Sequence, residues 1–132
     1  MGFSLTNAEL DLMLQYSEGN TAVLFLLIAI RCTEQGPLGC EMGIMDKRSN
    51  TLEKQVQWAR NTILSKEKQY KGGTARHPIT GLFVDEFLVY FSGKYAPADG
   101  TATNDPRGLN VNHLRLLRFF HSRCRYMLGE VA

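Results

Sequence analysis

The chain has few cysteines, no long hydrophobic run and little net charge, and each of these absences excludes a class of protein. Its three cysteines, Cys32, Cys40 and Cys124, are odd in number and form no CxxC pair. We therefore expect free thiols, with a Cys32–Cys40 bridge as the alternative. The longest apolar run has nine residues, whereas a membrane-spanning helix needs about 20. The net charge of +2 does not by itself indicate nucleic-acid binding.

Patterns for metals, export and repeats are also absent. The three histidines, His77, His113 and His121, form neither HExxH nor a zinc-finger spacing, so we expect no metal and no other cofactor. The first residues lack a basic segment followed by an apolar one, which predicts no secretory signal. No repeat or low-complexity tract divides the 132 residues, and this length fits a single domain over residues 1–132.

What the chain does contain is helical periodicity, and no convincing strand pattern accompanies it. Capping residues, apolar residues at helical spacing and terminal glycines predict an all-α fold of about five helices. The predicted helices run from the Thr6 cap to Gly19, from Asn20 or Thr21 to about Glu34, from the Asn50–Thr51 cap to Gly72–Gly73, from about Thr80 to Ser92, and from Asn110 or Asn112 to Leu128. Residues 35–49 and 94–109 are predicted loops, the first forming a short lobe.

The most hydrophobic stretch, Ala22–Ile30, leads directly to a carboxylate. Glu34 follows four residues after the stretch ends, and Gly36-Pro37 breaks the helix behind it. A carboxylate on the last turn of a buried helix loses solvent and lies at the negative end of the helix dipole, and both effects favour its protonated form. Glycosidases need such a group as general acid. The simpler alternative is a solvated carboxylate, because most carboxylates are exposed.

Two segments together resemble the lysozyme-like superfamily, which includes lytic transglycosylases and glucosaminidases. Residues 29–36, Ala-Ile-Arg-Cys-Thr-Glu-Gln-Gly, are similar to the family's helix that is followed by Glu-Ser-Gly. Gln35 stands where serine is usual. Residues 39–45 follow where that family places a glycine-containing turn. Residues 95–97, Tyr-Ala-Pro, with Asn104-Asp105 after them, are similar to the passage before the last helix of many bacterial and phage peptidoglycan hydrolases.

The resemblance implies a compact lysozyme-like domain that cleaves the glycan strands of peptidoglycan, with Glu34 protonating the glycosidic oxygen. Glu41 is the candidate second catalytic carboxylate, with Asp46 as a further possibility. Such a group is a nucleophile at about 5 Å from the acid and a base at about 6.5–9.5 Å, while assistance by the substrate's own N-acetyl group needs no second carboxylate. The alternative for Glu41 is a loop residue that binds backbone N–H groups.

The resemblance also implies substrate-binding residues around this acid, namely Tyr95, Tyr90, Gln35, Asn104 and Asp105. A tyrosine ring packs on a sugar face or hydrogen-bonds an N-acetyl group, and the alternative is a core aromatic at a helix end. For Asn104 and Asp105, which precede Pro106, the alternative is turn and capping chemistry.

The expected setting is a phage or prophage. The protein would reside in the host cytoplasm before release, or in the virion, and would act at the bacterial cell wall. One rival is an inactive lysozyme-like protein with a structural or binding role in a phage particle, with self-association as the alternative to a virion partner. The other is a nucleic-acid-binding module that uses the basic last helix. Because no helix-turn-helix spacing is present, we expect no nucleic-acid partner.

Overall fold

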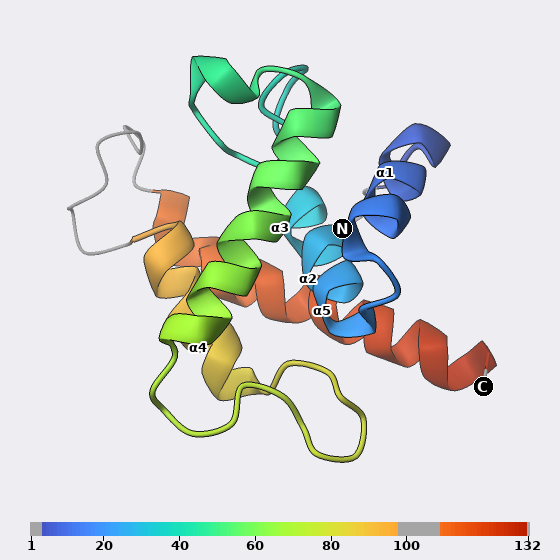
Figure 1. Ribbon diagram of the computed structural model, residues 1–132, viewed down its shortest axis with the longest axis vertical. Coiled ribbons are helices and arrows are strands. Elements are labelled where there is room, and N and C mark those ends of the chain that lie inside the picture. The colour runs from blue at the N-terminus through green and yellow to red at the C-terminus, as the bar shows by residue number, and fades with distance from the viewer. Residues whose placement is uncertain (1–3, 98–108, 132) are drawn as a thin grey trace.

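The computed structural model describes residues 4–97 and 109–131, with the side chains of residues 109 and 127–131 left aside. Within these ranges it confirms an all-helical fold (Figure 1). The five α-helices described are α1 (Asn7–Ser17), α2 (Thr21–Glu34), α3 (Leu52–Gln69), α4 (Asp85–Tyr95) and α5 (His113–Val131). Two 3₁₀ turns, η1 (Lys47–Ser49) and η2 (Leu109–Asn112), precede α3 and α5.

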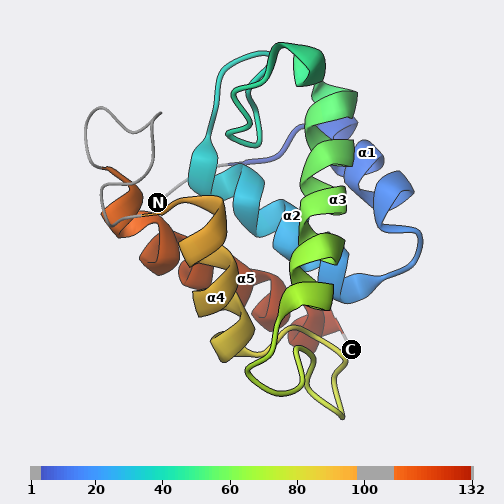
Figure 2. The same ribbon diagram turned by 60° about the vertical axis from the view of Figure 1, so that its left-hand side comes forward.

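Helix α2 is the centre of the core. Its residues are apolar on every side, which is typical of a helix surrounded by other helices, and α1, α3 and α5 all pack against it (Figures 1 and 2). Leu26, Leu27 and Ile30 have no exposed surface. No helix in the described ranges combines the length and apolarity needed to span a membrane. The apolar stretch of α2 is therefore mostly a core element, and Glu34 is the last residue of the helix and partly exposed.

The starts of the first three helices follow the predicted caps. Thr6 and Glu9 exchange hydrogen bonds in a capping box at α1. The Asn20 side chain accepts from the backbone N–H of residue 23 at 3.2 Å, and Thr51 accepts from that of residue 54 at 3.2 Å. These contacts satisfy N–H groups that the first turn of a helix leaves free.

Helix α4 begins and ends later than predicted, at Asp85 and Tyr95 instead of Thr80 and Ser92. The preceding residues form a turn in which Arg76 and Phe83 make an isolated antiparallel bridge. Residues 80–84 cannot join the helix because the flanking backbone groups bond across this turn, from the N–H of residue 77 to the carbonyl of 82 and from 84 to 75. The later end places Tyr95 on the last turn of α4, on the face shared with Ser92.

The loop lobe, residues 35–49, is attached to α2 and α3 by two side chains. Gln55 of α3 has no exposed surface; its Oε1 accepts the N–H of Met42 at 3.0 Å and its Nε2 donates to the carbonyls of Ile44 at 2.9 Å and Ser49 at 2.6 Å. Arg31 of α2 donates to two carbonyls of the lobe, at residues 36 and 41, both at 3.1 Å. The lobe therefore has a defined position over the end of α2.

Candidate functional site

Glu34 lies where two hollows of the surface adjoin. Figure 2 shows the end of α2 between the loop lobe and the corner formed by the end of α4 and the start of α5. The lobe-side hollow, about 200 Å³, is lined by Pro37, Gly43, Met45 and Tyr95 among others. The α5-side hollow, about 260 Å³, is lined by Thr33, Asn112, His113, Arg115 and Leu116. Glu34 and Asn110 line both, and the Glu34 side chain is 24% exposed.

A buried imidazole stands behind the Glu34 carboxylate. His113, the first residue of α5, is 5% exposed, and its Nε2 lies 3.1 Å from Glu34 Oε1. Its other ring nitrogen, Nδ1, lies 2.8 Å from Oγ of Ser92, a buried residue of α4. The Nε2 to Oε1 contact has the distance of a hydrogen bond but not its direction. The two groups are therefore in contact without a hydrogen bond between them.

Ser92, His113 and Glu34 form a Ser–His–acid series, which in serine hydrolases activates the serine. In this protein the acid of the series, and not the serine, is accessible from the hollows. Ser92 is 4% exposed and lines neither hollow, whereas Glu34 lines both. A nucleophile has to reach its substrate, so the serine is not the reacting group. The carboxylate is the end of this series that a ligand can touch.

Tyr95 lies beside Glu34, as the sequence predicts, but its hydroxyl is already engaged. The hydroxyl donates to the carbonyl of Met42 at 2.5 Å, and the ring stacks between Phe91 at 5.1 Å and His113 at 6.0 Å, centroid to centroid. Burial, with a smaller contribution from the charge of Glu34, raises the pKa of Tyr95 well above its usual value. Tyr95 therefore stays neutral and connects α4 to the loop lobe.

Gly43 brings the loop backbone against the other carboxylate oxygen. Its φ of +79° is in the left-handed region, and a Cβ at this position would lie 2.4 Å from Oε2 of Glu34. Oε1 thus faces His113, while Oε2 lies on the lobe side. The two oxygens of one carboxylate have different neighbours.

Glu41, the other predicted catalytic carboxylate, is oriented toward its own loop. It is 5% exposed, its Oε1 accepts the backbone N–H of Gly39 at 3.1 Å, and it is not among the residues that line either hollow. This is the loop-holding arrangement that the sequence left open, and a catalytic role for Glu41 has no support from the geometry. Asp46 is paired with Arg48 at 2.8 Å, and hydrogen bonds from Arg48 lower its pKa to about 2.

Two further predicted substrate-binding residues, Tyr90 and Gln35, are not among the residues that line the hollows. Tyr90 contacts the Tyr70 ring at 5.3 Å and lies under the Lys94 ammonium at 5.8 Å. Gln35 has a left-handed φ of 48°, and its side-chain amide donates to the carbonyl of Cys32 at 2.9 Å. Asn104 and Asp105 lie outside the described residues.

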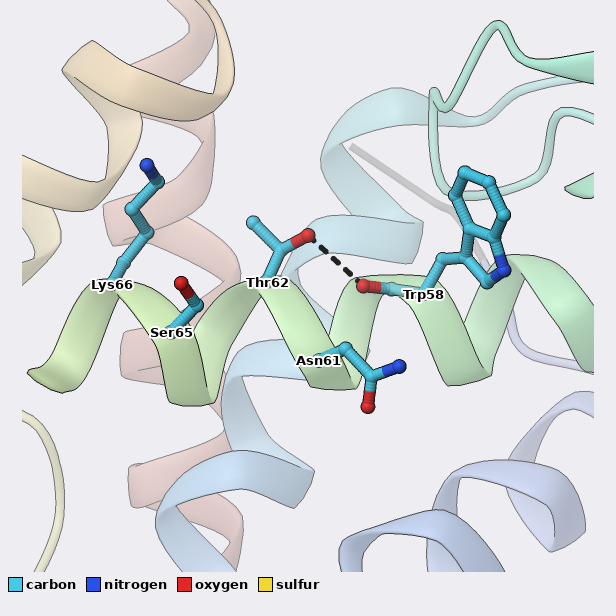
Figure 3. A pocket seen from close by; sticks show the side chains of 5 residues that line it. All are labelled: Trp58, Asn61, Thr62, Ser65 and Lys66. Carbon is cyan, nitrogen blue, oxygen red and sulfur yellow. Dashed lines mark hydrogen bonds between the residues drawn. The ribbon is translucent and has the colours of Figure 1, made fainter.

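A third hollow, of about 380 Å³, follows one side of α3 and is separate from Glu34 (Figure 3). Trp58, Thr62 and Lys66 extend from the same side of the helix there, and the Arg48 guanidinium lies 5.4 Å from the centre of the Trp58 ring. The other lining residues are Asn61 and Ser65. Because this lining contains no carboxylate and no histidine, it offers no group for acid–base chemistry near neutral pH.

Sequence reasoning missed three residues of the site, namely His113, Ser92 and Asn110. The sequence features that could have pointed to Ser92 and His113 are weak. Ser92 lies three residues before Tyr95 on one helix, and His113 follows a predicted helix start. Asn110 donates to the carbonyl of Pro97 at 3.0 Å and so connects η2 to the end of α4. Within the described ranges, no three His, Cys, Asp or Glu side chains gather as metal ligands would.

Comparison with known proteins identifies no relative: no protein-family model, no curated protein and no solved structure matches this chain. The resemblance of two segments to lysozyme-like proteins therefore stays a prediction. Function has to be argued from the geometry around Glu34.

Proposed function

We propose that the protein cleaves the glycan strand of peptidoglycan and that Glu34 is the general acid. The observation that carries this proposal is the position of the Glu34 carboxylate, at the end of a buried helix, open to two adjoining hollows and backed by an imidazole 3.1 Å away. Cleavage of a glycosidic bond needs an acid between the sugars on either side of that bond. The position of Glu34 on the lining of both hollows supports this role.

The lining of the hollows suits sugars. On the lobe side, Pro37 and Met45 offer apolar surface for the face of a pyranose. On the α5 side, Asn112 and Arg115 offer amide and guanidinium groups for hydroxyls, N-acetyl carbonyls or carboxylates. A strand that crosses the junction would place the bond between two sugars at Glu34.

The geometry favours a mechanism with one protein carboxylate. Of the described residues that line the two hollows, Glu34 alone carries a carboxylate. The proposal therefore assigns stabilisation of the oxocarbenium-like centre to the substrate's own N-acetyl carbonyl. Glu34 would first protonate the leaving sugar and then accept a proton from the attacking hydroxyl or water.

The test is digestion of purified peptidoglycan by the wild type, by Glu34→Gln and by the matched control Glu41→Gln. We expect Glu34→Gln to lower the rate by about 10²- to 10⁴-fold, because glutamine cannot donate a proton as the acid does. The control should keep most of the activity. A wild-type protein without activity, or a Glu34→Gln variant with full activity, would contradict the proposal.

Mass spectrometry of the same digests identifies the bond and the outcome. A 1,6-anhydromuramic end indicates a lytic transglycosylase, a reducing muramic acid end a muramidase, and a reducing glucosamine end a glucosaminidase. Because both sugars of the strand carry an N-acetyl group, assistance by that group is compatible with all three outcomes.

A further inference from the structure

We propose that His113, held by Ser92, is the positioning residue of Glu34. This inference rests on the proposed function and deepens it, because it identifies the groups that orient the acid and hold its charge after proton transfer. Its basis is the pair of contacts made by one buried ring, 3.1 Å from Nε2 to Glu34 Oε1 and 2.8 Å from Nδ1 to Ser92 Oγ.

The Ser92 hydroxyl pairs with either tautomer of His113, and we assign the tautomer in which it donates to Nδ1. A neutral imidazole has one N–H donor and one acceptor nitrogen, and a hydroxyl both donates and accepts. When the Ser92 hydroxyl donates to Nδ1, the hydrogen is on Nε2, the ring nitrogen that lies 3.1 Å from Oε1. The opposite tautomer would place the Nε2 lone pair against Oε1 and draw the acid proton to that oxygen, away from the lobe-side hollow. The first tautomer is therefore the one that leaves Glu34 able to donate from Oε2.

The same tautomer serves both halves of the reaction. Before cleavage, Oε2 carries the proton and Oε1 accepts the hydrogen of Nε2. As the glycosidic bond breaks, Oε2–H gives its proton to the leaving oxygen, which keeps the electron pair of the bond and becomes a hydroxyl. The carboxylate that remains keeps its hydrogen bond from Nε2, now charge-assisted and stronger. It then takes the proton of the attacking water or hydroxyl and returns to its first state.

The surroundings hold the ring in this orientation. The Tyr95 ring stacks on the imidazole with 19° between the planes, and the Tyr95 hydroxyl is bonded to the loop lobe. Arg115 lines the same hollow as Glu34 and His113, so it is the cation facing the pair from α5. A buried ring nitrogen with no acceptor would be costly, and the partly exposed carboxylate is the acceptor within reach.

The kinetic test compares two buried histidines of α5. His121 is 2% exposed, its Nε2 has no hydrogen-bond partner, and it lines neither hollow, which makes it a matched control. We expect His113→Leu to lower kcat by about 10- to 100-fold with little change in KM, the scale seen when a group that orients a reacting residue is lost. His113→Gln, which keeps an N–H donor near the position of Nε2, should recover part of this. His121→Leu should leave kcat within about twofold for the folded fraction.

Equal losses of kcat in His113→Leu and His121→Leu would show a structural effect and overturn the positioning role. Partial recovery of kcat in His113→Gln is the second readout, and a His113→Gln variant no more active than His113→Leu would also overturn the positioning role.

Ring ¹⁵N chemical shifts test the tautomer without any activity measurement. We expect a hydrogen on Nε2 and none on Nδ1 of His113 in the wild type, and a mixture of tautomers in Ser92→Ala. A hydrogen on Nδ1 in the wild type would overturn the inference even in an active enzyme. Absence of wild-type cleavage would instead contradict the proposed function, so the two failures are distinguishable.

Discussion

Glu34 and Glu41 lie seven residues apart in the sequence, the first at the end of α2 and the second in the loop lobe. Their side chains differ in burial and in hydrogen bonding. Glu41 is buried and its oxygen accepts a backbone N–H of its own loop. Glu34 is partly exposed, faces two hollows and has an imidazole nitrogen 3.1 Å behind it. A buried carboxylate that accepts a backbone N–H of its own loop supports that loop. A partly exposed carboxylate, with one oxygen near an imidazole nitrogen and the other on the side of an open hollow, is available for chemistry.

Among variants that leave both carboxylates in place, Gly43→Ala should have the largest effect on activity. The added methyl group would lie 2.4 Å from Oε2 of Glu34, so the carboxylate has to move. A displacement of about 1 Å at a reacting group costs about 100-fold in rate, and we expect kcat/KM for peptidoglycan to fall by that order.

Gly19→Ala is the matched control for Gly43→Ala. Gly19 has the same φ of +79°, but a Cβ there meets no atom within 4 Å. Both variants should lose similar stability in urea unfolding, about 1–2 kcal/mol for a left-handed alanine. A Gly43→Ala enzyme as active as Gly19→Ala would mean that the position of Oε2 does not matter.

Acid should weaken the fold through His121, and this effect has to be separated from any effect on Glu34. Burial, followed by the charge of Arg125, lowers the pKa of His121 to about 4 from 6.5, although Asp85 opposes the shift. Between these values the unfolded chain binds the proton and the folded chain does not. Stability is therefore full above about pH 6.5 and falls as the pH drops toward 4, by up to about 3 kcal/mol.

Urea unfolding at several pH values measures this loss of stability. His121→Leu should flatten the dependence between pH 4 and 6.5. A wild-type protein whose stability is constant over that window would contradict a buried, neutral His121.

Substitution of Glu41 should have a smaller effect, and on stability instead of chemistry. Glu41→Ala leaves the N–H of Gly39 without its acceptor, which should cost about 1–3 kcal/mol in unfolding experiments. Glu41→Gln keeps an oxygen at this site and should be nearly neutral. Activity per folded molecule should change by no more than a few-fold in either variant. A loss of activity in Glu41→Gln as large as that in Glu34→Gln would instead make Glu41 a second catalytic carboxylate.

Local signals predict the helices well and the start of α4 poorly. The caps at Thr6, Asn20 and Thr51 act within three residues, and the structure confirms all three helix starts. The residues before α4 have helical spacing, yet their backbone groups bond across a turn to residues 75–77. Gln55 shows the same limit: it lies on a predicted helix, but its burial under the loop lobe has no local signature.

The sequence by itself determined that the most apolar helix ends in Glu34 at the edge of a loop, because capping and periodicity act over three or four residues. Only the tertiary structure decided which of two nearby acids faces open hollows and which holds a loop. It also brought Ser92 and His113, 21 residues apart, together behind Glu34. These contacts depend on how α4 and α5 pack at the end of α2, and packing between helices distant in sequence cannot be deduced from any one of them.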